Sequence, residues 1–385
     1  MNAASPEPLI GVTRTGTVPA IVRKSSELLK AMFNEQRCLF AYSTRMKDGK
    51  YVNDFSNPAV YRYTINSFAG IQQARSLEGI DWDIDKNIEK FVKLSWQRIN
   101  NPADNGLLLY VLAVADHPDG HSQLKRVEGV VNDEKALVKL NLQEICWVLA
   151  GLTKYGELNG NPGSIVAAKK CWTILHRNYL NPHTFLPFYS LARCRRGLTS
   201  FGGIAYFLWS IYHYAHVFGD SDARTIFQDC VRQVMALQGK SGEWPWFINA
   251  NDGTVLDRYQ LYSVHQDSMA MLFLLPALDS GISEARTAIE NSYRWLFGKN
   301  ELHELMIHNS PFFVYRSIRR KTRLERATRY VRALACSALS VEAGTVSPTH
   351  LEINKECRSY HIGWLLFAWA GRKGFEEFSE LQLLK

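Results

Sequence analysis

The chain has 385 residues, of which 46% are hydrophobic and 21% charged, and its formal net charge is +8. This composition is that of a globular protein and excludes a disordered chain. The basic residues are dispersed except in one stretch, whereas dedicated nucleic-acid-binding domains concentrate them in a stripe or tail. We therefore expect no nucleic-acid partner. Aromatic residues make up 12% of the chain, enough to supply both a core and a ring-binding site.

The sequence shows no targeting or membrane signal. No segment approaches the roughly 20 apolar residues that cross a bilayer, and the first residues lack the basic and apolar regions of a secretory signal. The seven cysteines have no CxxC spacing and lie mostly in apolar helical contexts, where cysteine behaves as a small core residue. We expect reduced thiols and a cytoplasmic protein without a membrane span.

Hydrophobic periodicity predicts helices along almost the whole chain, and two kinds of helix alternate. One kind is amphipathic, and the other is apolar on nearly all sides, as expected of a helix surrounded by protein. In chain order, amphipathic or polar helices are predicted at 21–33, 84–99, 120–131, 164–179, 223–237 and 285–297. Buried helices are predicted at 59–74, 105–116, 142–155, 202–215, 269–278 and 360–371. An additional basic helix is predicted at 321–340, and the sequence DWDID at 81–85 is expected to cap the helix that follows it.

Six buried helices that alternate with six exposed ones predict an all-α fold. The expected architecture is an (α/α)6 barrel, or toroid, with an inner ring of helices enclosed by an outer ring. No linker rich in Pro, Gly or Ser divides the chain. We therefore expect a single domain over residues 1–385, in which residues 1–16 form a flexible N-terminal segment.

Polar side chains gather in the loops that lead into the buried helices. In a closed ring these loops emerge at one end, so residues far apart in the sequence would surround one central cavity. Three of the loops contribute Asn57, Arg62 and Tyr63; Arg193, Arg195 and Arg196; and Glu356, Arg358, Tyr360 and His361.

The loop at 242–270 is the longest and the richest in polar and aromatic residues. Its Asn251-Asp252-Gly253 turn predicts a short β-hairpin within residues 243–262. Flat rings stack on the face of a pyranose and polar groups fix its hydroxyls, so this composition suits a sugar site. The candidate substrate-binding residues here are Trp244, Trp246, Tyr259, Tyr262 and Gln266. The alternative is that the aromatic residues cap the barrel and that Asp267 is a helix N-cap.

Two chemistries fit these residues. Glycoside hydrolysis needs two carboxyl groups about 5–10 Å apart, and we nominate Glu243 and Asp267, with Asp257 as a substitute for either. His265 is the candidate general base or orienting group.

The other chemistry is abstraction of the C5 proton of a uronic acid. Tyr262, His265 or His361 would take the proton. The substrate carboxylate would be neutralised by the planar fork of Arg62, Arg316 or Arg358.

Metal and cofactor motifs are absent. His265, Asp267, His303, His308 and His361 are potential ligands, but no HExxH, HxH or CxxC spacing occurs. The sequence also has no G-x-G-x-x-G or G-x-x-x-x-G-K-[ST] phosphate loop and no G-x-S-x-G elbow. We expect no metal and no cofactor.

Basic residues concentrate only in the segment 314–332. This segment is a candidate surface for a phosphate, a polyanion or a protein partner. The alternative is a solvated helix face whose arginine stems cover apolar surface.

Taken together, these features resemble the α/α-toroid superfamilies. RYQLYSVHQDSMA and CRSYHIGW are similar to the loops around the aromatic-rich cavity of six-hairpin glycosidases and the related lyases and epimerases. Residues 238–244, QGKSGEW, are similar to a repeat of terpenoid cyclase and prenyltransferase toroids, although the D-x-D-D motif is absent.

The first resemblance implies a carbohydrate-active enzyme that cleaves or modifies an acidic glycan by carboxylate or histidine acid–base chemistry. The second implies a terpene cyclase-like enzyme with an aromatic cavity. A third hypothesis is a non-catalytic scaffold of a biosynthetic complex. The hypotheses differ in whether one water-accessible cavity collects the charged candidates, which are Arg62, Glu243, His265, Asp267, Arg358 and His361.

Overall fold

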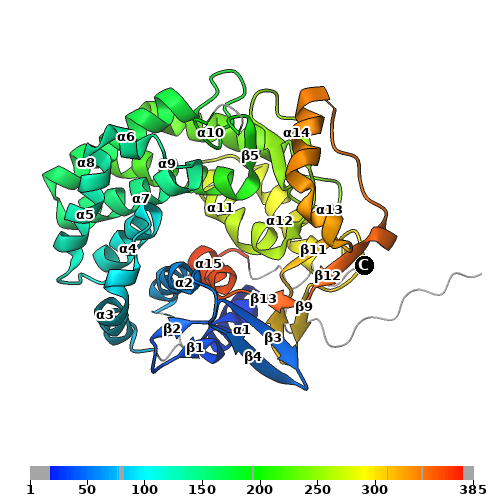
Figure 1. Ribbon diagram of the computed structural model, residues 1–385, viewed down its shortest axis with the longest axis horizontal. Helices are drawn as coiled ribbons and strands as arrows, with labels where there is room; N and C mark the ends of the chain where they lie inside the picture. The colour runs from blue at the N-terminus through cyan, green and yellow to red at the C-terminus, as the bar shows by residue number, and fades with distance from the viewer. Residues whose placement is uncertain are drawn as a thin grey trace, which may run out of the picture.

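The computed structural model describes residues 18–75, 77, 82–192, 195–309, 311–339 and 341–375. Most of these residues form two concentric rings of helices, and the chain runs once around the rings (Figure 1). The expected flexible segment 1–16 and Arg193 lie outside the described residues.

The inner ring contains the helices that are apolar on nearly all sides. Its members are α2 (Val60–Ala74), α4 (Pro102–Val114), α7 (Leu142–Asn159), α9 (Phe201–Phe218), the π-helical turn η3 (His265–Met269) with α11 (Met271–Asp279), and α15 (Ser359–Trp369). Each packs against the next, and α15 packs against α2, so that the ring is closed. The predicted (α/α)6 toroid is confirmed.

The outer ring is built from the amphipathic helices. They are α1 (Val18–Ala31), α3 (Ile84–Ser95), α5 (Gly120–Asn132), α8 (Pro162–Ile174), α10 (Ser221–Met235) and α12 (Ala285–Leu296). In α3, Ile84, Ile88 and Phe91 are buried, a spacing that places them on one face. Its N-cap is Asp83, which accepts a hydrogen bond from the backbone of Lys86, as the DWDID sequence predicts. Short helical segments extend or connect these helices: η1 (Trp96–Arg98), α6 (Glu134–Leu137) and η2 (Leu175–Tyr179).

Two pairs of inner helices approach closely because glycines face each other. A Cβ atom at Gly70 on α2 would collide with the backbone of Gly363 on α15. A Cβ atom at Gly151 on α7 would likewise collide with the backbone of Gly106 on α4. One hydrophobic cluster extends through both rings.

Thirteen short strands supplement the helices of the described chain, whereas the sequence predicts a single short hairpin. Three three-stranded sheets combine β5 (Leu198–Ser200), β6 (Phe247–Asn249) and β7 (Val255–Asp257); β8 (Leu261–Tyr262), β11 (Ser317–Arg320) and β12 (Leu351–Asn354); and β3 (Ser43–Lys47), β4 (Lys50–Asp54) and β13 (Glu356–Cys357). Two antiparallel pairs are β1 (Phe33–Asn34) with β2 (Leu39–Phe40), and β9 (Ile307–Asn309) with β10 (Phe312–Val314). The hairpin predicted within 243–262 is β6–β7.

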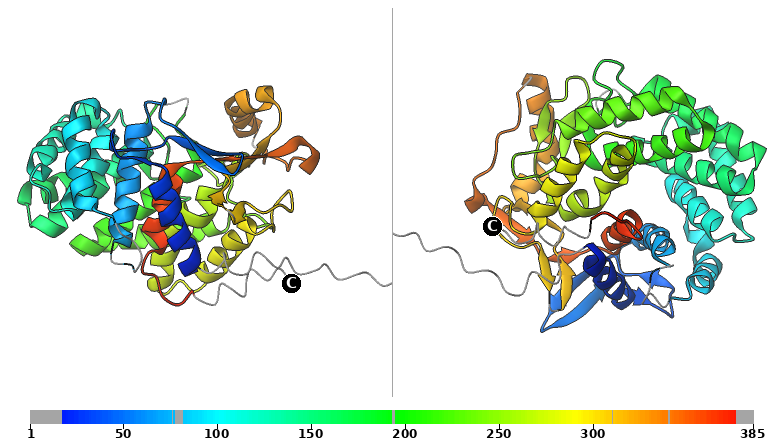
Figure 2. Two further views of the ribbon diagram at one scale, coloured as in Figure 1. Left: turned by 90° about the horizontal axis from the view of Figure 1, so that it is seen from below. Right: turned by 180° about the vertical axis from the view of Figure 1, so that it is seen from behind.

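The basic segment differs from its prediction. Residues 317–320 form strand β11, and the helix expected at 321–340 is two helices, α13 (Arg323–Ala327) and α14 (Arg329–Leu339). These helices and the β3–β4 strands lie at one end of the toroid (Figure 2). Arg320 is buried in an ion pair with Asp257, and Arg319 is paired with Glu352. The segment is therefore not one solvated helix face.

Two further properties bear on the expectations from the sequence. The described cysteines are all free, and all but Cys336 are buried. Among the described helices, none is both long and apolar enough to cross a membrane.

Candidate functional site

A central cavity of about 220 Å³ lies where the inner helices begin. Five members of the inner ring, α2, α7, α9, η3 and α15, contribute residues from their first two turns. The segments around β5, β6, β8 and β11 complete the wall. The lining residues are Arg62, Tyr63, Asn66, Gln143, Trp147, Ser200, Gly202, Tyr206, Trp246, Tyr262, His265, Met269, Arg316 and Tyr360.

The cavity collects six of the candidate site residues: Arg62, Trp246, Tyr262, His265, Arg316 and Tyr360. Sequence reasoning missed Asn66, Gln143, Trp147, Tyr206 and Met269. Their spacing could have identified most of them, because the cavity is lined by residues four positions apart: 62 and 66, 143 and 147, 202 and 206, and 265 and 269. Residues four apart lie on one helix face, so α2, α7, α9 and η3 each present two successive positions to the cavity.

His265 is the central titratable group of the cavity. It starts the π-helical turn η3, a local irregularity that occurs frequently at functional sites. Its ring is parallel to that of Trp246, with centroids 5.7 Å apart, and it also contacts Tyr262. Burial and the neighbouring His361 lower the pKa of His265 to about 3, so the imidazole is neutral at neutral pH. Its Nδ1 has no hydrogen-bond partner among the described residues.

Backbone hydrogen bonds fix the aromatic and basic groups around His265. The amide of Trp246 donates to the Asp257 carbonyl, which holds this ring at the start of β6. The Arg316 amide donates to the carbonyl of Asn354, at the end of β12. The Arg316 carbonyl accepts from the amide of Ser263, which follows β8, so the Arg316 backbone is held from both sides. The Arg316 guanidinium lies 5.4 Å from the centre of the Tyr262 ring.

The tyrosines of the cavity are hydrogen-bond donors at neutral pH. Burial raises the pKa of Tyr63 to about 12 and raises the pKa of Tyr360 well above its ordinary value. The two rings contact each other with centroids 4.5 Å apart. The described lining of the cavity thus combines protonated phenols, a neutral imidazole and two guanidinium groups, and it includes no carboxylate.

Asp267 and His361 lie outside this lining. Each is 2% exposed, and His361 Nε2 is 2.8 Å from both carboxylate oxygens of Asp267. Asp267 lies two residues after His265 inside η3 and is not the N-cap. Asp267 lines a different, small cavity with Tyr293 and Trp369, away from the side that His265 faces. Neighbouring Gln266 is also fully buried.

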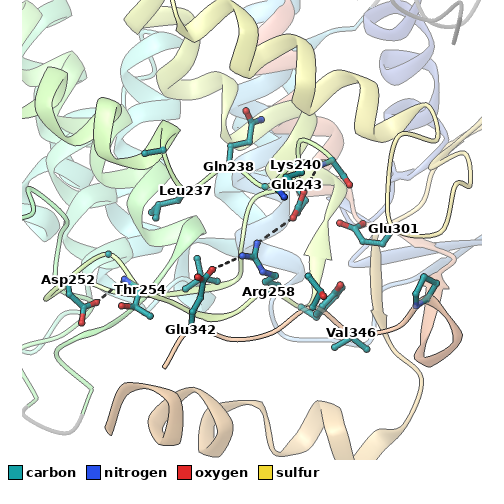
Figure 3. Close-up of a pocket in the computed structure, with 18 residues that line it drawn as sticks. Leu237, Gln238, Lys240, Glu243, Asp252, Thr254, Arg258, Glu301, Glu342 and Val346 are labelled. Atoms are coloured by element: carbon teal, nitrogen blue, oxygen red, sulfur yellow. Dashed lines mark hydrogen bonds and ion pairs between the residues drawn. The ribbon is translucent and has the colours of Figure 1, made fainter. Parts of the chain in front are cut away.

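Glu243 lines a second cavity, of about 860 Å³, together with Tyr259, Arg258 and Glu301 (Figure 3). Arg258 lies 3.5 Å from Glu243 and 2.7 Å from Glu342. Burial, together with the nearby charge of Glu243, raises the pKa of Glu301 to about 7.

The expected carboxylate pair therefore does not meet across one cavity. Glu243 and Asp267 line different cavities, and neither lines the central one. The side chain of Trp244 is fully buried, and its indole Nε1 donates to the Ser292 hydroxyl. The neighbouring Glu243 side chain points instead into the second cavity. The substitute, Asp257, is 1% exposed and ion-paired with Arg320.

Arg358 also stands apart from the central cavity. Its guanidinium lies 3.8 Å from the centre of the Tyr42 ring and donates to Glu356 at 2.8 Å. No group of three or more His, Cys, Asp or Glu side chains in the described part of the chain is arranged to hold a metal.

Comparisons with known proteins give fold relatives only. No protein-family model matches the sequence, and a comparison with curated proteins finds no match. The chain is similar to cellobiose 2-epimerase from Bacillus thermoamylovorans, with TM-score 0.62 and 10% identity over 92% of this chain and 98% of that chain. It is similar to unsaturated glucuronyl hydrolase from Bacillus sp. GL1, with TM-score 0.59 and 13% identity over 94% and 97%. A polysaccharide lyase matches with TM-score 0.56 and 10% identity over 82% and 90%. The chain has the α/α-toroid fold of the six-hairpin glycosidase-like enzymes.

Proposed function

We propose that the protein is a carbohydrate-active enzyme that modifies a sugar in the central cavity by acid–base chemistry of His265 and the surrounding tyrosines. The observation that carries the proposal is the described lining of the cavity, which offers guanidinium, phenol and imidazole groups but no pair of carboxylates. Aromatic faces with a few polar groups suit a sugar ring. A polar cavity of this kind favours a carbohydrate over a terpene precursor and favours an enzyme over a scaffold.

The proposed step is proton transfer at the carbon next to a carboxylate. His265 is neutral and can accept the C5 proton of a uronate, while an arginine stabilises the charge that develops on the carboxylate. A protonated tyrosine such as Tyr63 donates the balancing proton.

Two outcomes follow from the same step. If the tyrosine proton goes to the leaving oxygen, the C4–O bond breaks and a C4–C5 double bond forms. If the proton goes to the opposite face of C5, the sugar is epimerised. A bound anionic substrate raises the pKa of His265, because an opposite charge favours the protonated imidazole.

The fold relatives support this class of reaction. Their names include an epimerase, a lyase and a hydrolase of unsaturated glucuronyl groups, and each of these acts on a carbohydrate. The free, buried thiols support a cytoplasmic location, and the substrate would then be a small sugar or an oligosaccharide.

Asp104 supports hydrolysis as a second candidate. This carboxylate accepts a hydrogen bond at 2.5 Å from Nε of Arg62, which lines the cavity. Burial raises the pKa of Asp104, although Arg62 opposes this effect, and a raised pKa suits a general acid.

Solvent-deuterium exchange tests the proposal. Uronate-containing oligosaccharides incubated with the protein in D₂O should acquire deuterium at C5 or form an unsaturated product. His265→Gln and Tyr262→Phe should each slow this reaction by about a hundred-fold or more, because positioned acid–base groups contribute that much.

Glu243→Gln is the matched control, since its side chain lines the other cavity, and it should retain wild-type exchange. Glycan cleavage without exchange, lost in Asp104→Asn and retained in His265→Gln, would contradict the proposal and establish hydrolysis.

A further inference from the structure

The two guanidinium groups of the central cavity have different charge environments. Arg62 forms an ion pair with the carboxylate of Asp104. Arg316 shares its carboxylate, that of Glu356, with two other arginines. Arg45 is 2.5 Å and Arg358 is 2.8 Å from Glu356, while Arg316 is 3.3 Å from it. Three cations around one carboxylate leave positive charge in excess beside Arg316.

The neighbouring groups do not remove this excess. Glu356 is fully ionised: burial raises its pKa, but the hydrogen bond from Arg45 and the charges of Arg358 and Arg316 lower it to about 2. It therefore contributes a single negative charge. Asp54 also interacts with Arg358 and Arg45, but it is exposed, and solvent screens its charge.

Arg316 also has unused hydrogen-bonding capacity within the described structure. Its Nε has no partner among the described residues, and its bond to Glu356 is long for a charged pair. The Arg316 guanidinium interacts electrostatically with three phenol groups, those of Tyr63, Tyr262 and Tyr360. All three also line the cavity. A guanidinium with free donors among hydroxyl groups is a receptor for a carboxylate.

We propose that Arg316 selects an acidic sugar by binding the carboxylate of a uronate, and that Glu356 positions Arg316 for this contact. The inference rests on the proposed function, since it names the substrate class of the same cavity. Binding can be measured without turnover, however, so the two proposals can fail separately. Glu356 is a positioning residue, because it acts through Arg316 and does not line the cavity.

Calorimetry with D-glucuronate, D-glucose and D-glucose 6-sulfate tests the assignment. Wild type should bind glucuronate more tightly than the other two sugars. Arg316→Gln should weaken glucuronate binding by about ten- to a hundred-fold, the size of a lost charged hydrogen bond, and leave glucose binding unchanged. Arg316→Lys should restore part of the difference, since it keeps the charge without the planar fork. Glu356→Gln should weaken glucuronate binding less than Arg316→Gln does.

Arg319→Gln is the matched control, because Arg319 lies on the same strand and is paired with Glu352 outside the cavity. It should bind all three sugars as wild type does. The assignment is overturned if Arg316→Gln weakens glucose and glucuronate equally, if only Arg62→Gln removes the preference, or if the sulfate ester binds as tightly as glucuronate. Failure of wild type to bind glucuronate also overturns it. Glucuronate binding through Arg316, with neither C5 exchange nor an unsaturated product from uronate-containing oligosaccharides, would uphold the assignment and reject the proposed reaction.

Discussion

Individual side chains give the central cavity hydrogen-bonding groups without negative charge. His265 is kept neutral by burial, and Tyr63 is kept protonated, so both remain ready for proton transfer over a wide pH range. Arg316 keeps its charge because a guanidinium is not deprotonated in proteins. The polarity of the cavity therefore persists from acidic to alkaline solution.

Glu301 is the residue whose titration should be visible in stability. Its pKa is raised to about 7 in the folded protein, from an ordinary value of 4.5. Between these two values the native state retains a proton that the unfolded state has lost, so stability falls as pH rises through this window. Glu301→Gln should remove this loss and increase the free energy of unfolding at pH 8 by about 2–3 kcal/mol, with no gain at pH 4.

Urea unfolding at the two pH values measures this difference. Glu304→Gln is the control, because Glu304 is an exposed glutamate nearby, and its stability should match that of wild type at both pH values. Equal effects of Glu301→Gln at pH 4 and pH 8 would contradict the prediction.

At the scale of the elements, facing glycines set the distance between inner helices. Gly70→Ala should destabilise the protein by several kcal/mol, because the added Cβ atom would meet the backbone of Gly363, which cannot move without shifting α15. Thermal and urea unfolding would detect this loss.

Gly129→Ala is the matched control, since Gly129 lies inside α5 with nothing within 4 Å of the added atom. It should stabilise the protein by up to about 1 kcal/mol through helix propensity. A small effect of Gly70→Ala, like that of the control, would show that α2 and α15 are not held by close backbone contact.

The helices could be predicted because the spacing of apolar residues within each segment shows which positions are buried, as in α3. The strands could not, apart from the β6–β7 hairpin, because segments of two to five residues are fixed by distant partners. Strand β11, for example, pairs with β8 and β12, and a run of basic residues does not reveal this pairing. The loops that meet at the cavity were predictable from the alternation of helices.

The direction of single side chains was not predictable from the loop sequences. Glu243 and Trp244 are adjacent, yet Glu243 lines the second cavity and Trp244 is in the core. His265 and Asp267 are separated by one residue and face different surroundings. Composition identifies such a loop as rich in polar groups, but only the backbone decides which of them share a cavity.

At the scale of the whole molecule, polar contacts between distant segments reinforce the closed ring. Asp267 and His361 join the fifth inner helix to the last, and both are buried. Asp267→Asn should cost about 1–3 kcal/mol of unfolding free energy, because it weakens the buried hydrogen bonding between residue 267 and His361.

Asp279→Asn is the control for this prediction. Asp279 ends α11 and pairs with Arg372 at the surface, where an ion pair is worth about 1 kcal/mol or less. Urea unfolding of both variants would make the comparison, and equal small losses would mean that the buried pair does not hold the ring together.

The closure of the ring also has a consequence for the order of events during synthesis. Helix α1 packs against α15, and Ser359 donates to the carbonyl of Ala41 across 318 positions of the chain. While α15 is still inside the ribosome, the nascent chain has only five of its six inner helices. The apolar faces of α1 and α2 then lack α15, against which they pack in the finished protein. Tyr360 arrives with that same helix. The cavity is completed at the step that closes the core, so a ligand that binds there would distinguish finished molecules from incomplete ones.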